Sequence, residues 1–155
     1  MTRSSGFRRA GREYALRVLF GFDFLRGLGE EHPILFSPNW WKDDDCLFIN
    51  SESESFARQL ILSACKEQSR IDQFIQKHSK HWRLDRMSPV ERNILRLSVC
   101  ELLDEKGAPP KAIINEAVEL AKCYGDVDSP RFLNGVLDAL AANIRRSGNE
   151  PKNSG

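Results

Sequence analysis

One helical segment, residues 88–103, constrains the fold of this chain more than any other feature. It begins with a capping box: Ser88 precedes Pro89, and Glu91 stands at the third helical position, so that a hydroxyl and a carboxylate can accept from free backbone N–H groups. The apolar residues that follow cover most of the helix circumference: Ile94, Leu95, Leu97, Val99, Leu102 and Leu103. Because such a helix must be covered on nearly every side, the segment predicts the central buried helix of an all-α fold.

Two more helices are predicted after this segment. The first spans about residues 111–124 and is followed by Gly125 as the C′ residue; its buried stripe is Ile113, Ala117, Leu120, Ala121 and Tyr124. The second begins at Pro130, is capped by Asp128 or Ser129, and buries Leu133, Val136, Leu137, Leu140, Ala141 and Ile144. Both stripes have helical spacing, so each helix is expected to bury one face against the central one.

The first periodic segment, residues 9–26, is apolar on two sides. One stripe holds Ala15, Val18, Leu19, Phe22 and Leu25. The opposite face carries arginines at its start and aromatic residues further along: Arg9, Arg12, Glu13, Leu16, Phe20 and Phe24. A helix of this kind either lies sandwiched in a core or presents one side to a partner.

The middle of the chain is less regular. Residues 28–50 predict an irregular connection with one short helix near 38–44, and helical periodicity resumes from Phe56 and again from Ile71. We therefore expect about seven helices, with a frayed polar tail over residues 147–155. No apolar run approaches the roughly 18–20 residues of a membrane span, and no signal-peptide pattern is found, which favours a cytoplasmic protein.

Composition argues against several classes of function. The four cysteines are far apart and have no histidine at metal-ligand spacing, so we interpret them as free thiols and predict no metal site and no cofactor. The sequence has no glycine-rich phosphate loop and no nucleophile motif, which predicts a protein that is not an enzyme.

Charge is segregated along the chain although the net charge is only +1. Residues 1–26 hold six arginines against two acids, whereas residues 30–56 hold seven acids against a single lysine. Such segregation gives a near-neutral protein a local basic patch, which is either a nucleic-acid surface or only a solvated face.

Arg8, Arg9 and Arg12 are the first candidates for binding RNA. Guanidinium groups pair with phosphates through a rigid fork of donors, and cations at a helix N-terminus gain nothing from the helix dipole. The alternative is a basic tail that only keeps the protein in solution.

Asp128, Arg131 and Phe132, at the start of the last helix, are the second set of candidates. Phe132 lies off the apolar stripe of its helix, and single-stranded RNA is commonly held by stacking on aromatic or guanidinium planes. Asp128 either accepts a hydrogen bond from a base or caps the helix, and Phe132 either stacks on a base or packs internally. Gly135, in mid-helix, suggests close approach by another helix or by a partner.

With these residues in view, the chain resembles the NusB family of bacterial transcription antitermination factors. The resemblance covers residues 8 to about 146 and is weakest between 28 and 55. Its most specific parts are residues 90–96 (VERNILR), 114–122 (INEAVELAK) and 131–137 (RFLNGVL), supported by RRAGRE at residues 8–13. The resemblance implies a single domain over residues 1–150, made of two three-helix subdomains at 8–80 and 88–146, without enzymatic activity.

The resemblance also implies partners: boxA RNA, bound as a heterodimer with the ribosomal protein NusE, and elongating RNA polymerase indirectly. The predicted RNA-binding residues are Arg8, Arg9, Arg12, Phe20, Asp128, Arg131 and Phe132. The predicted partner-binding residues are Glu91, Glu13 and Leu16. Two residues depart from the family pattern: Phe20 replaces a frequent tyrosine and loses its hydroxyl, and Gly11 replaces a frequent alanine, which predicts a weaker helix start.

Two other interpretations stay open. The chain also matches the NusB-like domain of an RNA cytosine methyltransferase, although no Rossmann-type segment follows residue 146. It could instead be a helical protein-interaction module. The sequence leaves the oligomeric state open, and a homodimer would hide the arginine face.

Overall fold

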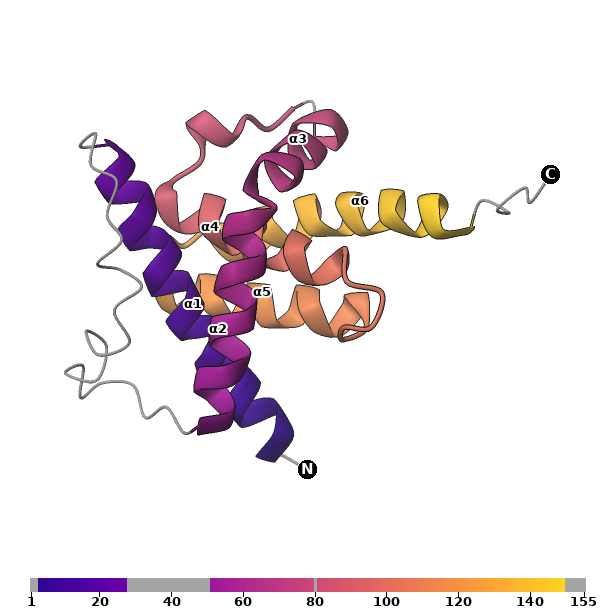
Figure 1. Cartoon of the computed structure of the whole chain (residues 1–155). Helices are drawn as coiled ribbons and strands as arrows, with labels where there is room; N and C mark the ends of the chain where they lie inside the picture. Colours follow the sequence, from indigo (N-terminus) through magenta and orange to yellow (C-terminus); the bar gives the residue numbers. More distant parts are fainter. Residues whose placement is uncertain (1–2, 28–50, 80, 150–155) are drawn as a thin grey trace. The chain divides into compact units, whose positions relative to one another are not determined.

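The computed structural model describes residues 3–27, 51–79 and 81–149, which form six α-helices and one 3₁₀ turn without any strand among them (Figure 1). The predicted all-α class is therefore confirmed. A short helix expected near residues 38–44, which would have been the seventh, lies outside the described residues. No helix in the described part is both long and apolar enough to cross a membrane.

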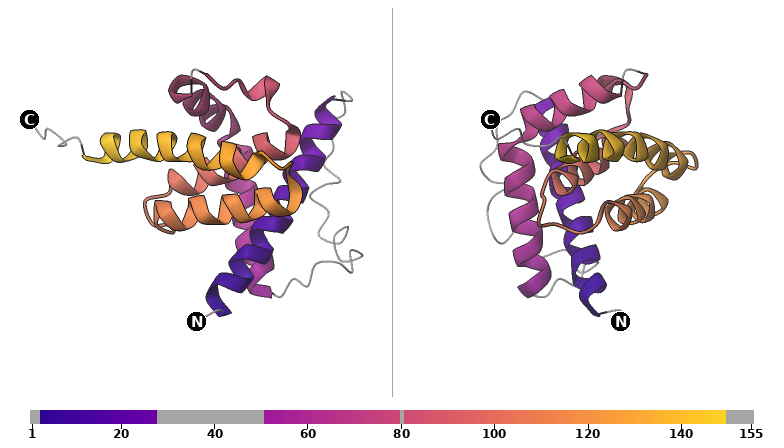
Figure 2. Two further views of the ribbon diagram at one scale, coloured as in Figure 1. Left: turned by 180° about the vertical axis from the view of Figure 1, so that it is seen from behind. Right: turned by 90° about the vertical axis from the view of Figure 1, so that its right-hand side faces the viewer.

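The first compact unit ends at Lys66 and contains α1 (Arg3–Gly27) and α2 (Ser51–Lys66). The two helices lie side by side in Figures 1 and 2. Ala15, Val18 and Leu19 of the predicted α1 stripe are buried, as expected. The phenol of Tyr14 is buried too, and burial raises the pKa of Tyr14, an effect that the Glu54 carboxylate on α2 increases.

Gly11 permits the close approach of α1 and α2. A Cβ atom at this position would lie 2.7 Å from Cδ1 of Phe56 and 3.1 Å from the carbonyl oxygen of Ser53. Helix α1 begins at Arg3 and runs through Gly11 without a break. The missing side chain makes room for the neighbouring helix.

The second unit begins at Glu67 and holds α3 (Gln68–His78), the 3₁₀ turn η2 (Leu84–Arg86), α4 (Pro89–Leu102), α5 (Pro110–Tyr124) and α6 (Ser129–Asn149). In this unit α3 packs on α4 and α6. The two subdomains at residues 8–80 and 88–146 that the resemblance implies stay a prediction.

Helix α4 is the centre of the second unit, as its pattern predicted. Helices α3, α5 and α6 all contact it, and four of its apolar side chains are almost fully buried: Ile94, Leu95, Leu97 and Val99. Helices α5 and α6 run alongside each other (Figure 2). A bidentate ion pair joins α3 to α4, with Arg96 Nε 2.9 Å from Asp72 Oδ1 and Nη2 3.0 Å from Oδ2.

The ends of these helices confirm one prediction and correct two. Ser88 and Glu91 form the expected capping box, with N–O distances of 3.2 Å in both directions. Gly125 is not a left-handed C′ residue: it is the C-cap itself, with φ −95° and extended backbone. Glycine is needed there for space, because a Cβ would lie 2.6 Å from the Cβ of Ser129. Helix α6 continues to Asn149, beyond the end predicted at residue 146.

Candidate nucleic-acid interface

The arginines near the start of α1 lie in two different environments. Arg8 and Arg9 are exposed, and the Arg8 guanidinium lies 5.8 Å from the ring centroid of Phe7. Arg12 is only 5% exposed, and its guanidinium lies 5.3 Å from the ring centroid of Phe56 on α2. A buried cation held over an aromatic face stabilises the packing of the two helices. Of these three arginines, Arg8 and Arg9 are the exposed ones.

The other predicted residues of α1 also differ in exposure. Phe20 is 41% exposed, so its ring is accessible to a partner. Glu13 is half-buried, whereas Leu16 is 2% exposed and belongs to the core. The predicted second face of this helix is therefore divided between core and surface positions.

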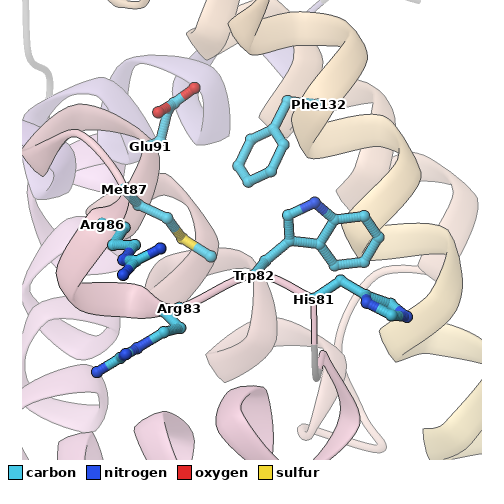
Figure 3. A pocket seen from close by; sticks show the side chains of 7 residues that line it. All are labelled: His81, Trp82, Arg83, Arg86, Met87, Glu91 and Phe132. Atoms are coloured by element: carbon cyan, nitrogen blue, oxygen red, sulfur yellow. The ribbon is translucent and has the colours of Figure 1, made fainter.

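In the second unit, η2 and the starts of α4 and α6 enclose an open cavity of about 530 Å³ (Figure 3). Its lining residues are His81, Trp82, Arg83, Arg86, Met87, Glu91 and Phe132. In Figure 3, Trp82 and Phe132 form one wall, and Met87 and Glu91 lie across from them. The cavity brings together two residues that were predicted separately, Glu91 and Phe132.

Phe132 packs edge-to-face on Trp82, with ring centroids 6.0 Å apart and an interplanar angle of 80°. Both rings are half-buried. Edge-to-face packing is a favoured arrangement that fixes the orientation of both rings. Phe132 therefore has an internal packing contact and also lines the cavity, so the two roles considered for it are compatible.

Both carboxylate oxygens of Glu91 accept hydrogen bonds. Oε1 accepts from the backbone N–H of Ser88 at 3.2 Å, and Oε2 accepts from Oγ of Ser129 at 3.0 Å. The Ser129 hydroxyl in turn accepts from the backbone N–H of Asp126 at 3.0 Å. Each carboxylate oxygen can accept one further hydrogen bond. The side chain is thus a fixed acceptor at the edge of the cavity.

Two arginines place positive charge at the cavity. Arg83 pairs with Asp85 at 3.2 Å, but both side chains are more than 60% exposed, so this ion pair is weak. The Arg86 guanidinium makes no hydrogen bond or ion pair with any described residue. The turn that carries them is anchored by Arg92, whose Nη1 donates to the carbonyl of Leu84 at 3.1 Å.

Asp128, Arg131 and Gly135 lie outside the cavity lining, and all three are exposed. No group among the described residues donates to the Asp128 carboxylate, so the expected side-chain cap on α6 is not made. A Cβ on Gly135 would meet nothing within 4 Å. Among the described residues no helix approaches Gly135 closely, and the alternative of a partner at this position stays a prediction.

The sequence-based prediction did not include Trp82, Arg83, Arg86 or Met87. The available signal was an aromatic residue among basic ones, in HWRLDR at residues 81–86, directly before the capping box. Within the described residues, no cluster of three or more His, Cys, Asp or Glu side chains could hold a metal ion.

Comparison with known proteins places these features in a family. The NusB family model matches residues 9–142. The chain is 38% identical, over 91% of its own length and 99% of the relative's, to the transcription antitermination protein NusB of Myxococcus xanthus. A structure of T. maritima NusB has a TM-score of 0.72 and 36% identity, covering 87% of this chain and 90% of that one. A chain from a crystal structure of the antitermination factors NusB and NusE in complex with double-stranded RNA has a TM-score of 0.74 and 32% identity, covering 92% and 99%. This chain therefore belongs to the NusB family.

Proposed function

We propose that this chain is a transcription antitermination factor that binds boxA RNA together with NusE, and that it has no enzymatic activity. The observation that carries the proposal is its match, along almost the whole length, to a NusB chain solved with NusE and RNA. Relatives named as transcription antitermination protein NusB match over equally long stretches. The RNA–NusE complex then acts on elongating RNA polymerase in the cytoplasm.

Arg8 and Arg9 pair with RNA phosphates, because both are exposed and arginine binds phosphate through two parallel donors. Phe20 and Phe132 offer aromatic surface to unpaired bases. The exposed carboxylate of Asp128 accepts a hydrogen bond from a base amino group. Arg131, exposed beside Phe132, adds positive charge. These assignments are proposals for single residues.

Arg12 and Leu16 are proposed to support the packing of α1 and not to bind RNA or NusE directly. Because both side chains are buried, we assign them to holding α1 in place, so that the exposed positions next to them face RNA or NusE. For NusE we propose contacts at Glu91 and Glu13, which carry charge and are half-buried. A homodimer would compete with these contacts and would be detected as a loss of NusE binding at high protein concentration.

The test is a titration of labelled boxA RNA and of a scrambled RNA of the same composition, with and without NusE. We expect tighter binding of boxA than of the scrambled RNA when NusE is present. Equal affinity for the two RNAs would refute the proposal. Binding of NusE without RNA cross-linking to Arg9 or Phe132 would instead assign the chain to protein interaction alone.

A further inference from the structure

We propose that the groove between α5 and α6 is a docking site for an extended segment of a partner protein that carries an arginine. The groove has a volume of about 360 Å³, which lies within the range of roughly 300–1,000 Å³ typical of ligand sites. None of its lining residues is among those proposed to contact RNA or NusE. The inference therefore adds a surface that goes beyond the proposed function.

The groove is apolar at its base and polar at its rim. Ile114 is 7% exposed and Ala141 is 6% exposed, so these two side chains lie at the base. The other residues that line the groove are exposed and come from both helices: Lys111, Asn115, Asn134, Asp138 and Ala142. A bound segment can therefore bury apolar atoms against the base while its polar groups meet those of the rim.

The polar groups of the rim are available to a partner. Neither the two asparagines of the rim nor Lys111 and Asp138 make a hydrogen bond or an ion pair with any described residue. By contrast, Lys122, further along α5, pairs with Glu119 at 3.0 Å. The groove thus holds an ammonium group, a carboxylate and two carboxamides that the described part of the chain leaves without partners.

These groups match an extended main chain and a guanidinium. A carboxamide offers both an acceptor and donors, so Asn115 and Asn134 can pair with the N–H and C=O groups of a peptide backbone. The Asp138 carboxylate can accept two parallel hydrogen bonds from an arginine. The Lys111 ammonium can only donate, and main-chain carbonyl oxygens would accept from it.

Gly135 gives a second, independent reason to expect a main chain at this place. A glycine inside a helix is destabilising relative to alanine, and no described neighbour requires it, because a Cβ there would meet nothing within 4 Å. Gly135 precedes the lining residue Ala142 by about two turns, so both lie on the same side of α6. A partner backbone that crosses α6 at Gly135 can approach the helix more closely than it could over a larger side chain.

The charge of the groove favours a protein segment over RNA. Among the described residues that line it there is no aromatic ring on which a base could stack, and no arginine. Asp138 would repel the phosphates of a nucleic acid, whereas a segment with one arginine places its positive charge on that carboxylate. A single ammonium group at the rim does not form the basic stripe that an RNA backbone requires.

The experiment is a nuclear magnetic resonance titration of the ¹⁵N-labelled full-length protein with capped pentapeptides. The probes are acetyl-Gly-Ala-Arg-Ala-Gly-amide and the same peptide with glutamine or glutamate at its centre. We expect saturable shifts of the side-chain amide signals of Asn115 and Asn134. The arginine peptide should bind about 3- to 5-fold tighter than the glutamine peptide, and the glutamate peptide most weakly. Absence of saturable shifts, or equal affinity for the three peptides, would overturn the proposal.

Three variants assign the effect to the groove. Asp138→Asn should make the arginine and glutamine peptides bind equally, whereas Glu105→Gln, which removes an exposed carboxylate outside the groove, should keep the preference for arginine. Gly135→Gln places a helix-favouring side chain where the main chain is expected to cross, so it should weaken all three peptides without unfolding the protein. A preference for arginine that survives Asp138→Asn would contradict the assigned pairing.

A parallel titration with heptauridylate tests the competing occupant. If this RNA shifts the Asn115 and Asn134 side-chain amides and the arginine peptide does not, the groove binds nucleic acid and the proposal is overturned. The peptide titrations contain neither boxA RNA nor NusE. Their failure therefore refutes this docking site alone, and a failure of boxA binding refutes the proposed function alone.

Discussion

At the scale of single residues, arginines that lie close together in the sequence have different roles. Arg8 and Arg9 are exposed, whereas Arg12, one turn later, is buried over the ring of Phe56. A guanidinium can do either, because its planar, weakly hydrated surface stacks on aromatic rings while its edge binds anions. The sequence run RRAGR therefore combines anion binding with helix packing.

Substitution of these arginines should separate the two roles. Arg8→Gln and Arg9→Gln should weaken binding of boxA and scrambled RNA alike, by about 3- to 10-fold each. Arg12→Gln should instead lower the free energy of unfolding by about 1–3 kcal/mol, because a buried stacked cation is lost. Urea denaturation and RNA titration of the same samples would decide, and a wild-type urea midpoint for Arg12→Gln would contradict the packing role.

Tyr14 should make stability depend on pH in the alkaline range. Its pKa is raised in the folded protein, by burial first and by Glu54 second, so the folded state keeps a proton that the unfolded chain loses near pH 10. The stabilisation is therefore fully present below pH 10 and is lost as the pH rises above it. We expect Tyr14→Phe to flatten the fall in urea midpoint above pH 10, and a pH profile identical to that of the wild type would contradict this cause.

At the scale of elements, two glycines in helices make opposite predictions. Gly11 lies where α1 and α2 approach closely, so Gly11→Ala should destabilise the protein by about 1–3 kcal/mol despite the better helix propensity of alanine. Gly135 faces open space in α6, so Gly135→Ala should stabilise by about 0.5–1 kcal/mol. Thermal unfolding of the two variants checks both signs, and a loss of stability in Gly135→Ala would mean that this helix position is constrained.

The contact between α3 and α4 gives a further prediction. Arg96 is 12% exposed and Asp72 27% exposed, and they share two hydrogen bonds. Arg96→Lys keeps the charge but loses the bidentate geometry, and should cost about 1 kcal/mol. Asp72→Ala should cost about 1–3 kcal/mol, because it leaves a largely buried guanidinium without its main partner. A ranking in which the lysine variant is the less stable of the two would contradict this account.

Periodicity and capping in the sequence predicted the elements of the second unit well. The capping box and the apolar surface around α4 could be predicted from the sequence because both depend on local spacing. Gly125 was misjudged because its glycine requirement arises from Ser129, a contact that spacing alone does not reveal. The attachment of α3 to α4 likewise depends on packing and on the ion pair of Asp72, which spacing alone does not reveal.

The candidate site was only partly predictable. Phe132 and Glu91 stood out as an off-stripe aromatic residue and a capping acid, but their meeting in one cavity depends on how α4 and α6 pack. Trp82 and Arg86 carried no helical periodicity, since they lie in a turn between helices. Residues in such connections acquire their role from the elements that hold them.

At the scale of the whole molecule, RNA-facing residues are proposed in both compact units, while the net charge is only +1. Affinity must then come from local charge, and we expect binding of boxA in the presence of NusE to fall steeply with salt. Each arginine contact to phosphate in a single strand adds about 0.7 to the slope of log K against log salt. Removal of both Arg8 and Arg9 should lower that slope by about 1.4, whereas an unchanged slope would show that these arginines do not touch phosphate.

The burial of Arg12 also has a consequence for genetics. An allele altered there should behave as a temperature-sensitive loss of the whole factor, with lowered abundance in the cell, because a folding defect of one or two kcal/mol exposes a protein to proteolysis. Alleles at the exposed Arg8 should leave abundance normal and impair only transcription. A screen that reads both protein level and growth would therefore divide this short arginine run into two phenotypic classes.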